Sequence, residues 1–372
     1  MDLTKTAFGS WSGGRFMHFG QRLEEDRWIN LARKAYDEGV RTFLTSDVYG
    51  VGKGDELLGK ALEGIDRDTY CLAAMIGHDI YDGQRNGAKG YARFTNPELR
   101  GPDGYEEYLE RATKQCAERC GTDHFDIVML HNPDSIGYSS PEVWSAIATL
   151  REKGLAETTG IAPGPANGFA IDMAYCMENF HEEIDSAMII LNPMEPWPGR
   201  YVLPIAQEFD IDILARVVDF GGIFHDDVKP GHYFKDGDHR TYRPEGWIEH
   251  GNEKLEKMRP IAEKYGLTML QLACVWDLSQ KPVVSVGPTF IQEAGDDARP
   301  VEEKIAEFAA LPDVTLTNEE IETIREIGNN EGCMPLKGAS TRYEGIDPQP
   351  DHWPMRPELQ PLADKWNLNP AW

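Results

Sequence analysis

Two side chains that can move a proton follow predicted strands in the first third of the chain. Tyr49 lies in the segment LTSDVYG (44–50), and His131 lies in the segment MLHNPD (129–134). Each segment continues an apolar run that is typical of a buried strand. A phenol can donate a proton, and an imidazole can accept one near neutral pH. We therefore expect acid/base chemistry with Tyr49 and His131 as the catalytic residues.

Further polar and aromatic residues fall near the ends of other predicted strands. We expect Arg216 to hold a carboxylate or another electron-rich oxygen of the substrate, because a guanidinium presents several fixed donors. An ion pair between Arg216 and Asp219 is an equally good interpretation. The expected pocket is lined by Trp11, Asp47, Trp197, Arg216, Asp219 and His225.

Amphipathic helices alternate with short apolar strands along the chain, a pattern that predicts parallel βαβ units. A helix over 24–39 leads to a strand at 40–44, and the pattern then repeats. The later strands are expected at 70–76, 124–130, 156–161, 187–191, 211–218 and 283–286. One more strand near the N-terminus would make eight. Eight such units close into an α/β fold of the (β/α)8 TIM barrel type, whose functional groups lie at the C-terminal ends of the strands.

Two long polar segments, 77–104 and 219–247, interrupt this pattern, and we expect them to form lids over the same end of the barrel. The C-terminal part from Pro335 to Trp372 shows neither helical nor strand period and carries Trp353 and Trp366. We therefore divide the chain into a barrel over 1–330 and an irregular, Pro/Trp-rich extension over 331–372. We expect the extension to cover a surface of the barrel or to make a homo-oligomer contact.

The composition limits the classes of partner. The 372 residues include 37 Lys+Arg and 63 Asp+Glu, which gives a net charge of −26. Such a protein lacks the electrostatic attraction for nucleic acid or an anionic membrane, so we expect a small-molecule substrate. There is no basic segment followed by an apolar run at the start and no run of 18 apolar residues, which favours a cytoplasmic protein. Six cysteines without a CxxC pair indicate reduced thiols.

Three motifs that could bind an ion or a phosphate are better explained otherwise. Cys116 and Cys120 lie four residues apart on a predicted helix, a spacing for which we favour core packing. The loop with His225, Asp226, Asp227, His232 and His239 is rich in possible ligands, but its spacing matches no known metal signature. We therefore expect no metal. The segment GVGKG (50–54) lacks the pattern of a phosphate-binding loop.

Several motifs together indicate a family. They are Trp11 after Gly9, the run AYDEGVRTFLTSDVYGVGKGDELLGKAL (35–62), the run CGTDHFDIVMLHNPD (120–134), and a helix ending in WDLSQ (276–280) before a strand. In these motifs the chain resembles the aldo/keto reductases over roughly residues 1–330. The resemblance implies the barrel fold.

The resemblance also implies an activity. Aldo/keto reductases reduce carbonyls with NADPH, using a tyrosine as general acid, a lysine and an aspartate that lower its pKa, and a histidine that orients the carbonyl. The tyrosine and the histidine correspond to Tyr49 and His131. The aspartate position falls on Leu44 and the lysine position on Met75. Without the ammonium group a phenol keeps a pKa near 10. Leucine and methionine cannot supply the missing charges, and we expect Leu44 and Met75 to form substrate-facing walls.

The cofactor contacts implied by the resemblance are altered as well. Nicotinamide contacts of the family fall on Ala162 and Pro163, on Ile190 or Leu191, and near Arg216. The 2′-phosphate site reads Pro288, Thr289 and Phe290, followed by the acidic segment 293–297. Thr289 and Glu303 remain as candidate cofactor contacts. We expect that NAD(P) is absent or weakly bound.

These substitutions favour a lyase-like or isomerase-like enzyme on a reductase scaffold. The hypothesis is acid/base chemistry without hydride transfer, namely elimination, hydration or isomerisation of a small oxygenated carbonyl, sugar or phenolic substrate. The first alternative is an NAD(P)H-dependent aldo/keto reductase in which His78 or Asp47 replaces the missing partners. The second alternative is a catalytically inactive barrel that serves as a regulatory subunit.

Overall fold

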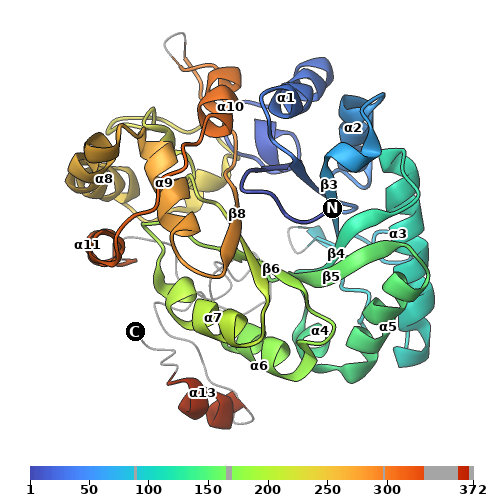
Figure 1. Ribbon diagram of the computed structural model, residues 1–372. Helices are drawn as coiled ribbons and strands as arrows, with labels where there is room; N and C mark the ends of the chain where they lie inside the picture. Colours follow the sequence, from blue (N-terminus) through green and yellow to red (C-terminus); the bar gives the residue numbers. More distant parts are fainter. Residues whose placement is uncertain (88–89, 165–169, 296–297, 331–358, 368–372) are drawn as a thin grey trace.

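A closed ring of eight parallel strands forms the centre of the protein (Figure 1). The computed structural model describes residues 1–87, 90–164, 170–295, 298–330 and 359–367. Each strand pairs with the next in chain order, from β1 to β8. A parallel bridge between Thr6 and Val286 joins the first strand to the last. The structure thus confirms the expected (β/α)8 barrel.

The strand positions also agree with the sequence-based prediction within a few residues. The strands are β1 Ala7–Gly9, β2 Thr42–Ser46, β3 Cys71–Ile76, β4 Phe125–His131, β5 Ala156–Ala162, β6 Ser186–Ile190, β7 Asp212–Arg216 and β8 Val283–Gly287. Every residue of β2, β3 and β4 is buried, as expected for parallel strands covered by helices. β4 runs one residue further than predicted and includes His131.

Helices surround the barrel, as Figure 1 shows. The longer ones are α1 Glu25–Asp37, α2 Lys53–Leu62, α3 Tyr105–Cys120, α5 Pro141–Glu152, α6 Ala170–Phe180, α7 Trp197–Glu208, α8 Trp247–Tyr265, α9 Met269–Leu278, α10 Val301–Ala309 and α11 Asn318–Gly328. The short helices are α4 Ser135–Ser139 and α13 Gln360–Trp366. Their ends follow ordinary capping chemistry: α9 begins with a capping box between Thr268 and Gln271. The sequence-based prediction missed α4, α10, α11 and α13.

The apolar side chains form two layers. A large outer layer fills the space between the strands and the helices. A smaller cluster fills the barrel interior and consists of Ala7, Trp11, Leu44, Cys71, Ala73, Met75, Ile127, Met129, Ala162, Met188 and Leu214. Because side chains alternate along a strand, Leu44 and Ser46 of β2 project to the same side of the sheet. Because Leu44 belongs to the interior cluster, Ser46 at the end of β2 also faces the barrel interior.

The described part of the C-terminal extension differs from the prediction. We expected no regular structure there, yet Gln360–Trp366 form α13. The indole of Trp366 donates a hydrogen bond to the Glu178 carboxylate on α6 at 2.7 Å, and the Lys365 ammonium lies 2.9 Å from the same group. This segment therefore packs against the barrel of its own chain. Cys333, Pro335, Trp353 and Trp372 lie outside the described residues.

None of the helices in the described ranges combines the length and the apolar character that crossing a membrane requires.

Candidate active site

The structure places Tyr49 beside His131 at the C-terminal end of the barrel strands. Tyr49 lies in the turn after β2, and His131 is the last residue of β4. The two rings are 6.0 Å apart between centroids and are inclined by 79°. Tyr49 is half-buried and His131 is buried. The two predicted catalytic residues therefore share one site.

The turn after β2 fixes the position of Tyr49. Its backbone N–H donates to the Ser46 carbonyl at 2.9 Å, and its own carbonyl accepts from the N–H of Gly54 at 2.9 Å. Phe16 stacks on the Tyr49 ring with 6.5 Å between centroids. Gly50 has a positive φ of 63°, and a Cβ there would lie 2.7 Å from the Phe16 ring. The tyrosine is thus held by backbone bonds on one side and by a ring on the other.

His131 is oriented by Ser46, a residue that the sequence analysis did not single out. The Ser46 hydroxyl lies 2.8 Å from Nδ1 of His131 and donates to the Met75 carbonyl at 2.8 Å. Burial lowers the pKa of His131 to about 3, and the charges of Arg93 and Arg216 act in the same direction. The imidazole is therefore neutral at physiological pH.

The long segment after β3 contributes two basic residues to this site. His78 and Arg93 form an antiparallel bridge, and the His78 ring lies 5.1 Å from the His131 ring. Nη1 of Arg93 is 3.2 Å from Nδ1 of His78, and Nε of Arg93 donates to the Asn132 carbonyl. Burial, followed by the charge of Arg93, keeps the pKa of His78 well below its usual value. Arg93 thus carries a positive charge close to His78 and His131.

Asp47, the other proposed replacement for the missing partners, is fully buried. Neither of its carboxylate oxygens has a hydrogen-bond partner among the described residues. Burial, and then the nearby Asp55, raise its pKa well above the usual value. Burial therefore disfavours the charged form of Asp47.

Apolar residues form the floor below Tyr49. Leu44 and Met75 are fully buried in the interior cluster, and Tyr49 packs against this cluster. Trp11 belongs to the same cluster and covers Gly9 so closely that a Cβ on Gly9 would lie 2.2 Å from its ring. The expected walls Trp11, Leu44 and Met75 are thus brought together with Tyr49.

Asp219, His225 and Thr289 form a separate buried group. The Asp219 carboxylate accepts from the backbone N–H of Thr289 at 2.7 Å and from that of Gly222 at 2.9 Å. Burial raises the pKa of Asp219 to about 6, although these N–H donors oppose the shift. Nε2 of His225 donates to the Thr289 carbonyl at 2.9 Å. In place of the expected substrate contacts, Asp219 and His225 join the loop after β7 to the segment after β8.

The remaining predicted residues are also spread over different surroundings. Trp197 begins α7 and lies in the outer apolar layer, where its ring packs against Tyr201 at 5.3 Å. Arg216 ends β7 and donates through Nη2 to the carbonyls of Pro163 and Gly164, at 3.2 and 2.9 Å. Glu303 is exposed on the first turn of α10.

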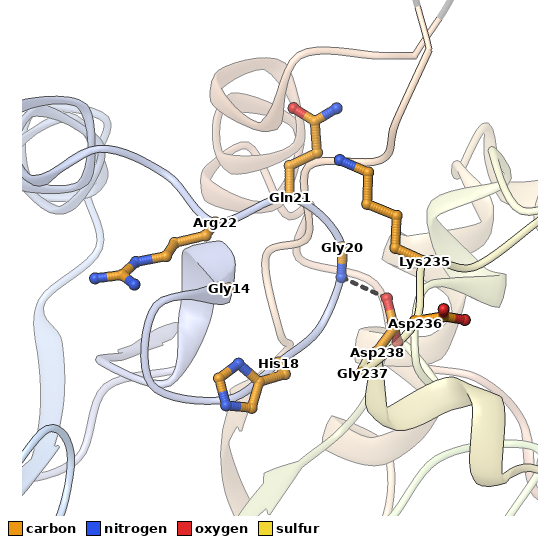
Figure 2. A pocket seen from close by; sticks show the side chains of 9 residues that line it. All are labelled: Gly14, His18, Gly20, Gln21, Arg22, Lys235, Asp236, Gly237 and Asp238. Carbon is orange, nitrogen blue, oxygen red and sulfur yellow. Dashed lines mark hydrogen bonds between the residues drawn. The ribbon is translucent and has the colours of Figure 1, made fainter.

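A cleft of about 540 Å³ lies between the loop after β1 and the loop after β7 (Figure 2). Its lining residues are Gly14, His18, Gly20, Gln21, Arg22, Lys235, Asp236, Gly237 and Asp238. The two loops are fastened where the N–H of Gly20 donates to the Asp238 carboxylate at 2.8 Å. Basic side chains beside glycine backbone are the groups that bind phosphates. Arg22 and Lys235 are such donors, and the carboxylates of Asp236 and Asp238 line the same cleft.

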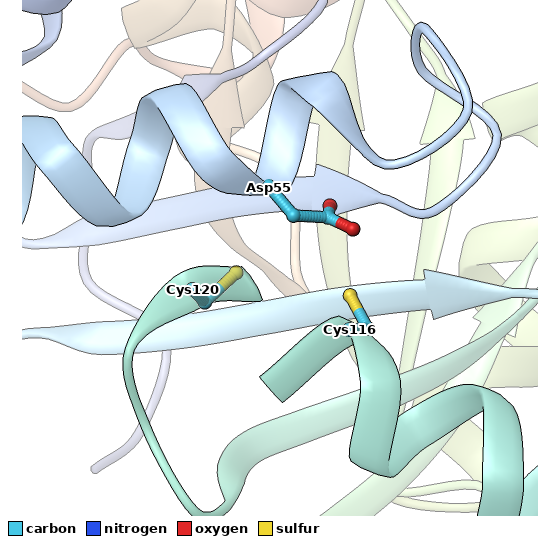
Figure 3. Close-up of side chains that lie close together, drawn as sticks. All are labelled: Asp55, Cys116 and Cys120. Atoms are coloured by element: carbon cyan, nitrogen blue, oxygen red, sulfur yellow. The ribbon is translucent and has the colours of Figure 1, made fainter. Parts of the chain in front are cut away.

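One buried cluster has the ligand types of a metal site. One ligand atom each of Asp55, Cys116 and Cys120 lies within 4.8 Å of the others (Figure 3). Asp55 already accepts from the Thr45 hydroxyl at 2.7 Å and from Nε of Arg119 at 2.9 Å. The guanidinium neutralises the carboxylate and would repel a metal ion. Core packing of the two α3 cysteines, as we expected, explains the cluster.

Comparisons with known proteins bear on the function. The model of the aldo/keto reductase family matches residues 7–329. Versiconal hemiacetal acetate reductase from Aspergillus parasiticus is 24% identical over 374 residues, which cover 88% of this chain and 94% of that protein.

Solved structures share the fold. A glycerol dehydrogenase from Gluconobacter oxydans has a TM-score of 0.68 at 20% identity and covers 96% of this chain and 95% of its own. An aldo/keto reductase from Klebsiella pneumoniae in complex with NADP and acetate has a TM-score of 0.58 at 17% identity. The match covers 87% of this chain and 91% of the Klebsiella chain.

These findings contradict the hypothesis of a lyase or isomerase without hydride transfer. Most of the chain matches a reductase family, one relative is a reductase, and a protein of the same fold binds NADP. The hypothesis rested on the residues Leu44 and Met75 and on the altered cofactor contacts. The structure brings Arg93 to the site from the loop after β3.

Proposed function

Because the chain belongs to the aldo/keto reductase family, we propose that it is an NAD(P)H-dependent oxidoreductase that interconverts a small carbonyl compound and its alcohol. The observation that carries this proposal is the pairing of Tyr49 with His131 at the barrel mouth, within the matched range 7–329. Both residues occupy the positions of the tyrosine and the histidine in the family motif.

Tyr49, His131 and the apolar floor below them have different roles in this reaction. In the reductive direction Tyr49 donates its hydroxyl proton to the substrate oxygen, and it recovers a proton in the oxidative direction. His131 lies beside Tyr49 in the same site. The nicotinamide, when bound, supplies or accepts the hydride. Trp11, Leu44 and Met75 form an apolar floor that excludes water and strengthens the electrostatic interactions above it.

Arginine charge takes the place of the missing lysine in this proposal. Arg93 and Arg216 both act on the pKa of His131, whose ring contacts Tyr49. A nearby positive charge stabilises a tyrosinate and lowers the pKa of the phenol. Arginine stays charged at every pH of interest, so its effect is constant.

We propose that the cleft between the loops after β1 and β7 holds the phosphate groups of the cofactor. Arg22 and Lys235 supply positive charge there, and Gly20 and Gly237 allow close approach of the backbone. The side chains of Thr289 and Glu303 remain proposed contacts for the rest of the dinucleotide.

A titration tests this function directly. We expect NADPH or NADH to quench the tryptophan fluorescence of the protein in a saturable manner. Some members of a panel of small aldehydes and ketones should then cause oxidation of the bound cofactor. The absorbance of the reduced cofactor measures this reaction. If neither cofactor binds, and no member of the panel causes cofactor oxidation, the proposed function is wrong.

A further inference from the structure

Ser46 holds a position from which it can decide which nitrogen of His131 carries the proton. It is fully buried as the last residue of β2. Its Oγ lies 2.8 Å from the Met75 carbonyl oxygen and 2.8 Å from Nδ1 of His131. Both distances are those of good hydrogen bonds.

The two contacts together fix the direction of each bond. A serine hydroxyl has one hydrogen, and a carbonyl oxygen can only accept. If the hydroxyl hydrogen points to Met75, Oγ is left with lone pairs toward His131. Nδ1 of His131 must then carry the proton and donate it to Oγ. The reverse assignment would leave two oxygens 2.8 Å apart with no hydrogen between them.

A neutral imidazole with its proton on Nδ1 has a bare lone pair on Nε2. Burial, Arg93 and Arg216 hold the ring neutral by lowering its pKa to about 3. The other groups that face the ring are His78, whose pKa is lowered as well, and Tyr49. Of the hydrogen bonds recorded among the described residues, none involves Nε2 of His131.

We propose that Ser46 is a positioning residue that fixes His131 as the Nδ1–H tautomer, so that Nε2 accepts a hydrogen bond from a substrate hydroxyl. The inference rests on the proposed function in one respect: the ligand is one member of a carbonyl–alcohol pair. A lone pair on Nε2 attracts an O–H group and repels a carbonyl oxygen. The site therefore recognises the alcohol member of the pair.

The preference has an expected size. Sites that hydrogen-bond a particular substrate group discriminate against analogues that lack this group, because a buried polar atom is then left unpaired. For one hydrogen bond to a neutral acceptor we expect a roughly tenfold tighter binding of the alcohol. Replacing Ser46 by alanine removes the oxygen that holds the Nδ1 proton, so the ring can adopt the other tautomer and the preference is lost.

Nitrogen NMR of the full-length protein labelled with ¹⁵N-histidine reads the tautomer without cofactor or substrate. His131→Gln assigns the signals of His131. We expect the wild-type protein to show a protonated Nδ1 and a bare Nε2 at pH 7. Ser46→Ala should shift the proton wholly or partly to Nε2, whereas Ser46→Thr keeps a hydroxyl and should keep the wild-type pattern. A protonated Nε2 in the wild-type protein, or an unchanged tautomer in Ser46→Ala, overturns the proposal.

A matched pair of ligands tests the consequence. Cyclohexanol should perturb the Nε2 signal of His131 at about tenfold lower concentration than cyclohexanone, and Ser46→Ala should abolish this difference. Equal effects of the two compounds on the wild-type protein overturn the recognition of an alcohol. These measurements are independent of the cofactor titration. If no nicotinamide binds while His131 keeps its Nδ1 proton, the proposed oxidoreductase function fails and the positioning by Ser46 is supported.

Discussion

Nη1 of Arg93 lies 3.2 Å from Nδ1 of His78, which places a permanent positive charge one ring away from His131. Arg93 comes from the long segment after β3, and His78 is the second residue after that strand. Lysine and aspartate are absent from the family positions at Met75 and Leu44. In the proposed mechanism the loop after β3 therefore supplies positive charge to the site.

Tyr49→Phe should abolish most of the turnover and leave cofactor binding intact. The substitution removes the proposed proton donor but keeps the ring that stacks on Phe16. General acid catalysis contributes about 10²- to 10⁴-fold, and we expect a loss of kcat in this range. Steady-state kinetics and a fluorescence titration with NADPH measure the two effects. Tyr265→Phe, at the end of α8, serves as the control and should keep full activity. Normal turnover in Tyr49→Phe would exclude Tyr49 as the acid.

Arg93→Gln should raise the pKa of the Tyr49 hydroxyl. Without the guanidinium the tyrosinate loses a stabilising charge, so the proton leaves only at higher pH. In the pH profile of the alcohol oxidation rate, the apparent pKa that reports loss of this proton should increase by about one pH unit. Arg93→Lys keeps the positive charge, and its apparent pKa should lie between those of Arg93→Gln and the wild-type enzyme. If the profile of Arg93→Gln equals that of the wild-type enzyme, the guanidinium of Arg93 does not stabilise the tyrosinate of Tyr49.

His131 should make the protein less stable in mild acid. Its pKa is about 3 in the folded state and 6.5 in the reference state, so between these values only the unfolded chain binds the proton. Stability therefore falls as the pH drops through this window. Between pH 7 and 4.5 the loss from this one group is about 2 to 3 kcal/mol.

Urea unfolding at both pH values, for the wild-type protein and for His131→Gln, measures this contribution. The variant should lose less stability between pH 7 and 4.5 than the wild-type protein does. His250→Gln, at an exposed position of α8, is the matched control and should behave as the wild type. An identical pH dependence in His131→Gln and the wild type would mean that the buried imidazole can be protonated in the folded state.

Local patterns were enough to predict the barrel. Strands such as β4 are continuous apolar runs, and α1 lies within the predicted range 24–39 because amphipathic periodicity and a terminal glycine coincide there. α10 was missed because the acidic segment 293–297 precedes it and carries no helical pattern. The helix in the C-terminal extension, α13, was missed because it packs on residues far away in the sequence, such as Glu178 on α6.

The site was predicted in part, for a physical reason. Tyr49 and His131 carry local motifs, so their positions at strand ends followed from the sequence. Arg93 has no such motif, since only the bridge to His78 brings it to the site. Ser46 had a weak signal: it lies two residues after Leu44 in a strand and therefore shares its inward direction.

Gly9→Ala should weaken substrate binding through Trp11. A Cβ at this position would lie 2.2 Å from the Trp11 ring, so the indole must move away from the interior cluster on which Tyr49 packs. We expect KM to rise about tenfold, the effect of losing one well-packed apolar contact, together with a change in tryptophan emission. Gly101→Ala, where a Cβ meets open space, should change neither quantity. An unchanged KM in Gly9→Ala would remove Trp11 from the substrate pocket.

Arg240→Met should loosen the loop after β7 and the cleft that it borders. The guanidinium is buried, lies 2.5 Å from Glu293 and 2.9 Å from Asp238, and stacks on Phe234 at 4.1 Å. Methionine preserves much of the side-chain volume but leaves two buried carboxylates without their cation. Breaking such a buried pair costs about 3 to 5 kcal/mol.

Because Asp238 also accepts from Gly20, this loss should reach the cleft between the two loops. We expect faster hydrogen exchange over 235–242 and weaker binding of NADPH, measured by mass spectrometry and by fluorescence titration. Arg259→Met, whose guanidinium is partly exposed in its pairs with Asp226 and Glu256, should change stability by less than about 1 kcal/mol and leave NADPH binding unchanged. If Arg240→Met exchanges faster yet binds NADPH normally, this loop does not hold the cofactor phosphates, and the cleft must be excluded from the cofactor site.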